Sequence, residues 1–446
     1  MRLGVVILAA ASGLLFGSAA TVRAADAPTF EPPTATSQFL TAITLREAVT
    51  LPPGAARLEA LVTTEGSERT FVDPVEIPGT GAQTLTYRFD TPSGALIANT
   101  LVTLAFRVTL SDGSQVTGPS ATVRYADSRF EWQTLSGSLV TVHWVQGDRA
   151  FGQHALDIAQ NAIQQASQLL GVSETQPIDF YVYDDQTAMY QMLGPSTREN
   201  VGGVAFPEIR TLFADIGAAD LTDAWVGIVI PHELTHLVFA TATDNPYHEP
   251  LHWLNEGLAV YLSQGYDDAD RQAVEEAAAD RSLMPLSSLS GQFPTSADRF
   301  SLAYSESVSA VDFMVRRYGR DRLVTLIRSY ARGVGDDEAF TAGIGVDTAA
   351  FEAAWLADLH APAPGPFGPR PAPAGPVPPG WGTGAAGGGA APGGPGSSGL
   401  LGSGGASGSS GPSAGSLAWV LVLLGLVGVG LGGAALAMRE RTRPEP

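Results

Sequence analysis

The sequence contains no cysteine and no lysine among its 446 residues. Without thiols the chain can form neither a disulfide framework nor a thiolate metal site, and cysteine catalysis is excluded. All 25 basic residues are arginine and 45 residues are acidic, so the formal net charge is −20. This acidity argues against nucleic acid as a partner of the folded body. The use of arginine alone suggests a bacterial source with a GC-rich genome.

Histidine is also scarce, yet two of the seven histidines stand four positions apart in the segment HELTH, His232 to His236. Residues at this spacing share one face of a helix, so both imidazoles can reach a single point. Glu256 offers a carboxylate shortly downstream. Zn²⁺ accepts these ligand types, and a catalytic zinc has three protein ligands and one position open to water. The sequence therefore predicts one zinc ion at His232, His236 and Glu256, with Glu233 free to take a proton from that water.

An alternative for this segment is an amphipathic helix whose two histidines have no chemical role. A chance His-Glu-x-x-His is expected in roughly one in a hundred chains of this composition, which favours the zinc site. Pro231 directly precedes the motif. It either bends a longer helix or marks the helix start, and both alternatives leave the two histidines one turn apart.

Two segments together resemble the gluzincin zinc metallopeptidases, the group that includes thermolysin and aminopeptidase N. They are HELTH at 232–236 and WLNEG at 253–257, and the second is especially similar to the aminopeptidase N family. The resemblance implies a thermolysin-like zinc peptidase core in which His232, His236 and Glu256 bind zinc and Glu233 is the general base. It also implies that Asn255 steadies one of the ligands.

A third segment, AYSES at 303–307, is similar to the compact bacterial peptidases called peptidase MA-like. The resemblance implies that Tyr304 hydrogen-bonds the oxyanion of the reaction. Tyr304 also shares a helical face with Val308 and Val311, so a role in the core stays open. We find no Gly-x-Met-x-Asn stretch of the kind that holds a free amino terminus in aminopeptidase N-like enzymes. The resemblance therefore does not carry an aminopeptidase specificity.

The pattern of apolar residues predicts two folded domains. Residues 37–126 read as short alternating strands, which predicts an all-β sandwich of immunoglobulin or fibronectin type. Residues 128–360 place strands before helices, an α+β order, and the resemblance implies that they form a peptidase MA-like metallopeptidase domain. We expect a helix over 149–170 and further helices near 304–318, 320–332 and 348–359. The resemblance also implies that residues 211–216 are an edge strand that binds substrate by strand addition, and an ordinary sheet strand without a ligand role stays open.

The chain ends predict export and a membrane anchor. Residues 1–25 read as a signal peptide cut near Ala24. Residues 361–416 form a Pro/Gly/Ser-rich linker, and the uncharged segment 417–438 is long enough for one transmembrane helix. The basic tail, 439–446, then lies in the cytoplasm. The predicted protein is a single-pass cell-membrane protein with its catalytic domain outside the cytoplasm.

The sequence thus predicts a membrane-anchored, extracytoplasmic zinc-dependent peptidase that acts on a peptide or protein substrate. The alternatives are a catalytically inactive zinc-holding module for binding or adhesion, and a cell-surface stalk. His248 and His252 fall in a segment rich in turn residues. Either one can line the cleft and touch the oxyanion, but an exposed loop histidine is the favoured interpretation of each.

Overall fold

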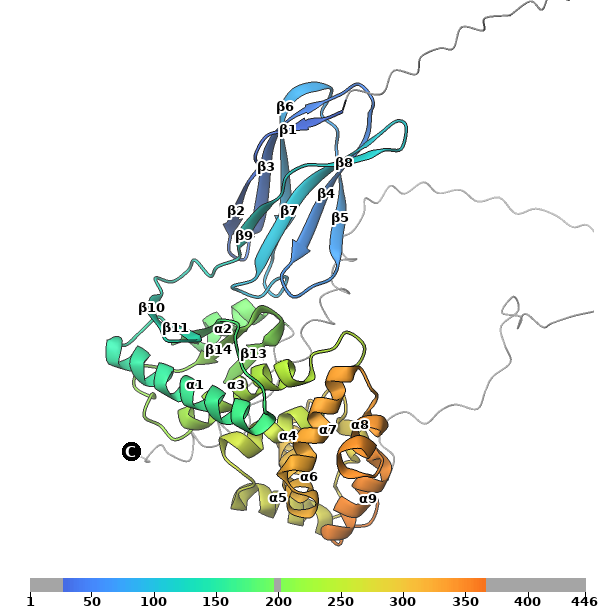
Figure 1. The fold of residues 1–446 in the computed structure, drawn as a ribbon. Coiled ribbons are helices and arrows are strands. Elements are labelled where there is room, and N and C mark those ends of the chain that lie inside the picture. The colour runs from blue at the N-terminus through green and yellow to red at the C-terminus, as the bar shows by residue number, and fades with distance from the viewer. Residues whose placement is uncertain (1–26, 196–201, 366–446) are drawn as a thin grey trace, which may run out of the picture. The chain divides into compact units, whose positions relative to one another are not determined.

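The computed structural model describes residues 27–195 and 202–365 (Figure 1). Their contacts divide them into two compact units, residues 27–92 with 98–126 and residues 93–97 with 127–365. The predicted signal peptide, the transmembrane helix at 417–438 and the tail at 439–446 lie outside the described residues. Those three assignments, and the linker beyond residue 365, stay predictions.

The first unit is a β-sandwich, as predicted. In one sheet β3 pairs with β1, β2 and β6; in the other β4 pairs with β5 and β7, and β7 also pairs with β8 and β9. Every one of these pairs is antiparallel. Buried residues alternate with exposed ones along β3, which is typical of a strand with one face in a core. The strands are β1 (Thr29–Phe30), β2 (Thr34–Gln38), β3 (Ala42–Leu51), β4 (Ala55–Thr64), β5 (Thr70–Val75), β6 (Gly81–Asp90), β7 (Leu101–Leu110), β8 (Gln115–Thr117) and β9 (Ala121–Arg124).

The second unit contains a mixed sheet with the strand order β10-β11-β12-β14-β13. The central strands β11 (Val140–Trp144), β12 (Ile178–Tyr183) and β14 (Thr211–Asp215) are parallel. The edge strands β10 (Gln133–Ser136) and β13 (Gly203–Phe206) are antiparallel to their neighbours. The prediction that residues 211–216 form the edge is wrong. The chain reverses through the short helix η1 (Pro207–Ile209), so β14 lies inside the sheet and β13 takes the edge.

Two helices share the apolar core with this sheet. Helix α1 (Arg149–Leu170) has the predicted bounds, because Asp148 caps its first turn and Gly171 ends it at a φ of 64°. Helix α3 (Val226–Thr243) carries the HELTH segment and is 72% buried, although by length and composition alone it is apolar enough to cross a membrane. Pro231 lies inside α3, so the alternative that the helix starts there is wrong.

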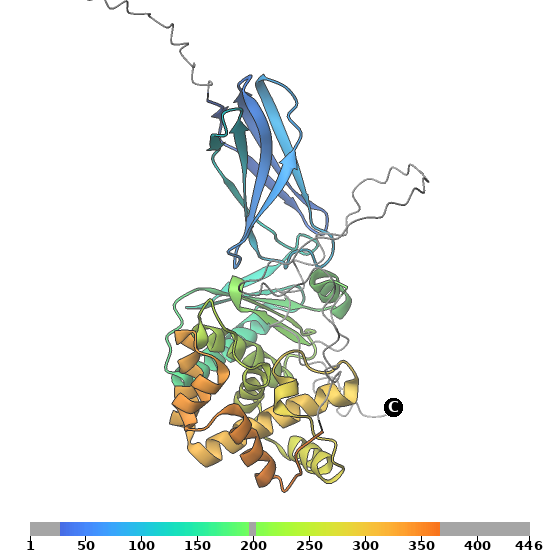
Figure 2. The same cartoon turned by 90° about the vertical axis from the view of Figure 1, so that its right-hand side faces the viewer.

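The remaining helices complete the second unit, and most of them lie on one side of the sheet (Figure 2). Helix α6 begins at Ala297, earlier than predicted, because Ser296 already takes the extended conformation of a helix cap. The helices are α2 (Gln186–Leu193), α4 (His252–Ser263), α5 (Asp268–Ala279), η2 (Leu286–Leu289), α6 (Ala297–Tyr318), α7 (Arg320–Ser329), η3 (Tyr330–Arg332), α8 (Asp336–Ile344) and α9 (Thr348–Asp358).

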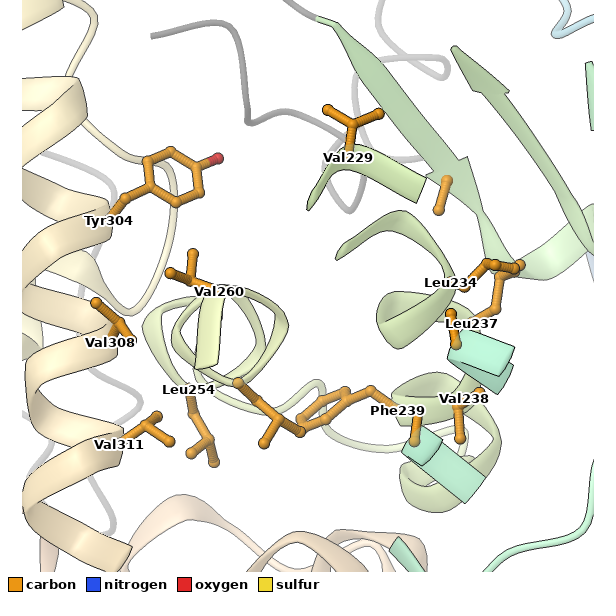
Figure 3. Close-up of a cluster of buried hydrophobic side chains, with 14 of the residues drawn as sticks. Val229, Leu234, Leu237, Val238, Phe239, Leu254, Val260, Tyr304, Val308 and Val311 are labelled. Carbon is orange, nitrogen blue, oxygen red and sulfur yellow. The ribbon is translucent and has the colours of Figure 1, made fainter. Parts of the chain in front are cut away.

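Helix α4 is buried between α3 and α6 (Figure 3). Its apolar side chains Leu254 and Val260 pack in the same cluster as Val308 and Val311 of α6. The close approach of α4 and α6 depends on Gly257. A methyl group at that position would lie 2.4 Å from the carbonyl oxygen of Ser307, far inside van der Waals contact.

We expect Gly257→Ala to lower the free energy of unfolding by about 1–3 kcal/mol, because α4 and α6 must separate to admit the methyl group. Gly227→Ala on α3 is the control, since nothing lies within 4 Å of a methyl group there. Urea unfolding followed by tryptophan fluorescence measures the change in the second unit, because all seven tryptophans follow residue 126. Equal stability of the two variants would contradict the close packing.

Candidate metal centre and active site

Helices α3 and α4 bring three potential ligands to one buried point. The rings of His232 and His236, one turn apart on α3, have their centroids 4.8 Å from each other. Glu256 of α4 places Oε2 3.3 Å from Nε2 of His232 and 3.6 Å from Nε2 of His236. The three residues each offer a ligand atom within 4.8 Å of the other two, and all three are buried. The structure therefore brings together the three residues predicted from the sequence as ligands.

These atoms fit a tetrahedral divalent cation. Two ligands at the usual zinc distances of about 2.0–2.1 Å lie roughly 3.3 Å apart, close to the separations around Oε2. Among the described residues, both ring nitrogens of His232 and Oε2 of Glu256 lack any hydrogen-bond partner. Buried polar atoms are normally paired, so the unpaired Nε2 of His232 and Oε2 of Glu256, 3.3 Å apart, are consistent with a cation between them.

Burial sets the charge of the site. It lowers the pKa of His232 well below the usual value, and neighbouring His236 adds to the effect. Burial also lowers the pKa of His236 to about 4, so both rings are neutral, the form that binds metal. The pKa of Glu256 is raised well above the usual value by burial and by the charge of Glu233, while a hydrogen bond with Tyr304 opposes the change. A cation would offset the cost of ionising this carboxylate.

Asn255 fixes the orientation of one ligand. Its Oδ1 lies 3.0 Å from Nδ1 of His236. Because an amide oxygen only accepts, Nδ1 of His236 must carry the proton. Nε2 then keeps the lone pair that faces Glu256. This contact gives Asn255 the place that the resemblance implied for it.

Glu233 lies next to the edge strand β13. The backbone N–H of Ala205 hydrogen-bonds its carboxylate, and burial raises the pKa of Glu233 well above the usual value. A methyl group at residue 203 would lie 2.9 Å from Cγ and 3.0 Å from Oε1 of Glu233. Gly203 is therefore the residue that allows the strand to approach this carboxylate. The sequence shows two adjacent glycines, Gly202 and Gly203, but only the structure shows that Gly203 is required by the nearby carboxylate of Glu233.

Tyr304 lies in the apolar core and also next to the metal centre, while its predicted contact with the oxyanion stays a prediction. It is buried on α6, with its ring centroid 5.1 Å from that of Phe293 and 5.2 Å from that of Phe300. Its hydroxyl also reaches the carboxylate of Glu256, and its ring lies 6.3 Å from that of His232. Figure 3 shows the side chain extending from α6 toward the space beside α4. Packing in the core and contact with the site are thus compatible for this residue.

The two loop histidines have different surroundings. Nε2 of His248 lies 3.0 Å from Oδ1 of Asp336, and its ring stacks on Tyr330, so it joins the loop to the C-terminal helices. His252 instead begins α4 and lies 3.6 Å from Oε1 of Glu256. The favoured interpretation of His252 as an exposed loop residue is wrong. The spacing in the sequence could have indicated this contact, because His252 precedes Glu256 by four residues, about one helical turn.

A comparison with protein-family models agrees with the resemblance to peptidase MA-like proteins noted in the sequence. The sequence model described as Peptidase MA superfamily matches residues 158–361, which include every residue of this site. The match covers less than half of the chain, so it shows a similarity of residues 158–361 to this superfamily. The resemblance noted in the sequence is therefore confirmed, and the matched part of the second unit is called the peptidase MA domain below.

The relatives of the peptidase MA domain are distant. Aminopeptidase M1-D of rice is 26% identical over 166 residues, which are 33% of this chain and 18% of that protein. Among solved structures, an aminopeptidase N family protein from Idiomarina loihiensis is 9% identical, covers 72% of this chain and 76% of its own, and has a TM-score of 0.38. An M1 zinc metallopeptidase from Deinococcus radiodurans is 12% identical over 77% and 97% of the chains, with a TM-score of 0.35. TM-scores this low establish no common global fold.

We expect Asn255→Ala to weaken zinc binding about 10–100-fold, because the ring of His236 loses the acceptor that fixes its tautomer. Competition with a chelating dye measures this affinity. Asn161→Ala is the matched control, since it makes the same change at an exposed position of α1. Unchanged zinc affinity in Asn255→Ala would contradict the proposal that the Asn255 side chain orients His236.

Proposed function

We propose that this chain is a zinc metallopeptidase that hydrolyses peptide bonds. The observation that carries the proposal is the convergence of His232, His236 and Glu256, with the carboxylate of Glu233 alongside and outside the ligand set. A site that only holds a metal for stability has no need for that additional buried carboxylate. The similarity of residues 158–361 to the peptidase MA superfamily supports the same function.

Each residue of the site then has a chemical task. His232, His236 and Glu256 would hold the zinc ion, which when bound would supply acidification of water and polarisation of the scissile carbonyl. Glu233 takes a proton from the water and returns it to the leaving amine. Burial raises the pKa of Glu233, and this change makes its carboxylate a stronger proton acceptor. The hydroxyl of Tyr304 exchanges its contact with Glu256 for a hydrogen bond to the carbonyl oxygen as negative charge develops there.

The edge strand β13 supports an extended peptide as substrate. Asp215 donates its N–H to the carbonyl oxygen of Gly202, so Gly202 faces β14 and the polar groups of Gly203 and Ala205 point away from the sheet. The N–H of Ala205 contacts Glu233, so a peptide that pairs with this edge passes beside the proposed base. The strand has no Gly-x-Met-x-Asn sequence, and we propose that internal bonds, and not only amino-terminal ones, are cleaved.

We expect Glu233→Gln to reduce kcat about 10²–10⁴-fold, because the amide cannot accept the proton of water. Zinc content should stay at one ion per chain, since Glu233 is not a ligand. Glu275→Gln, which changes an exposed glutamate of α5, is the control. A peptide-library digest with and without chelator, followed by mass spectrometry, measures cleavage and its specificity.

The alternative of an inactive zinc-holding module for binding or adhesion gives a different result in this digest. The wild-type chain would bind zinc and leave all peptides intact, and Glu233→Gln would change nothing. Chelator-sensitive cleavage by the wild type, lost in Glu233→Gln, contradicts that alternative.

We further propose that the peptidase MA domain lies outside the cytoplasm and is attached to the membrane by a C-terminal transmembrane helix. The apolar amino-terminal segment and the uncharged segment 417–438, followed by Arg439, Arg441 and Arg443, support this location. We expect the full chain to sediment with membranes, and a chain ended before residue 417 to be soluble outside the cytoplasm. Protease digestion of intact cells followed by immunoblotting measures the topology. Full protection of the peptidase MA domain would contradict it.

A further inference from the structure

His252 and Glu256 lie one turn apart on α4, at different depths. The side chain of His252 is 15% exposed and that of Glu256 only 1%. Nε2 of His252 lies 3.6 Å from Oε1 of Glu256, within ion-pair range but longer than a hydrogen bond. The other oxygen, Oε2, faces His232 and His236. The two oxygens of Glu256 therefore have different neighbours, one on the outer side and one on the side of the metal centre.

We propose that His252 is a positioning residue for Glu256. Its imidazole N–H, 3.6 Å from Oε1, attracts this oxygen electrostatically to the outer side, so that Oε2 alone is presented to the metal. This inference rests on the proposed function, because it requires Glu256 to be a ligand. A carboxylate that binds through one oxygen leaves the fourth tetrahedral position free for water, which a catalytic zinc needs. A carboxylate that binds through both oxygens would crowd that position.

The surroundings of His252 restrict its ring. Phe293 packs its ring edge-to-face with His252 at 4.6 Å and with Tyr304 at 5.1 Å. Phe293 itself is only 2% exposed. The backbone N–H of His252 also donates to the carbonyl oxygen of Ser290 at 3.1 Å. One buried phenyl ring thus holds both of the side chains that contact Glu256 from outside the ligand set.

The segment that carries Phe293 is in turn fixed to α6. Both carboxylate oxygens of Glu306 accept from the backbone N–H of Met284, at 3.0 and 3.2 Å. Arg299 donates to the carbonyl oxygen of Ser282 at 3.1 Å. These contacts tie the chain before Phe293 to the helix that also carries Tyr304. The position of His252 is therefore determined by packing and not only by its place on α4.

Three substitutions of His252 test the proposal in the full chain. His252→Gln keeps an N–H donor at nearly the same reach, His252→Asn shortens that reach by one methylene, and His252→Leu removes the donor. We expect zinc affinity close to the wild type for His252→Gln and a loss of about 10–100-fold for the other two. X-ray absorption of the zinc-loaded protein should find one additional oxygen neighbour in His252→Leu, because Oε1 is released toward the metal.

His248→Leu is the matched control, because it removes a histidine that contacts a carboxylate away from the metal centre. Wild-type zinc affinity in both His252→Leu and His252→Asn would overturn the proposal. So would a third imidazole in the wild-type absorption spectrum, since His252 would then be a ligand itself. If His252→Leu does not fold, the comparison of the two amides decides: equal affinities of His252→Gln and His252→Asn overturn the proposal.

The experiments distinguish a failure of the proposed role of His252 from a failure of the proposed peptidase function. A wild-type chain that binds no zinc overturns both. A chain that binds zinc but cleaves no peptide overturns the proposed function alone, because the affinities of the His252 variants are measured without substrate. Cleavage with unchanged affinities in those variants overturns only the role of His252.

Discussion

The second unit is organised around ionisable groups held in apolar surroundings. His232, Glu233 and His236 lie on a helix that is buried on nearly all sides, and Glu256 faces them from a second buried helix. Carboxylates in such a place are costly unless positive charge or hydrogen bonds offset the loss of water. The neighbouring groups supply part of this through Ala205 and Tyr304. The unpaired Nε2 of His232 and Oε2 of Glu256 lie 3.3 Å apart, and that is the physical basis for a divalent cation there.

Two glycines allow the elements around this point to come close enough. Gly257 lets α4 approach α6, which carries Tyr304, and Gly203 lets the edge strand approach Glu233. In both places a single methyl group would meet atoms of the opposite element at less than 3.0 Å. The distances between ligand, base and edge strand are thus set by residues that have no chemistry of their own.

Much of the local structure could be predicted because its causes are local. Helix α1 begins after its N-terminal cap Asp148 and ends before its C-terminal cap Gly171, and both residues are visible in the sequence. The start of α6 at Ala297 was missed because the apolar pattern becomes clear only later in that helix, and Ser296 makes no side-chain capping bond. The edge strand was misassigned because the order of strands depends on pairing between distant segments. The apolar run Leu212 to Ala214 of β14 has no feature that tells whether one neighbour pairs with the strand or two.

The sequence by itself determined the set of chemical groups at the metal centre. Two imidazoles and one carboxylate lie within five consecutive residues of one helix, 232–236, and a second carboxylate, Glu256, follows downstream. Helical spacing fixes which side chains share a face, and that spacing can be counted along the chain. Only the tertiary structure decided that β13 lies beside Glu233 and that Phe293 holds His252 against Glu256. These contacts join segments that lie tens of residues apart, and packing between such segments follows from shape and volume that no local period encodes.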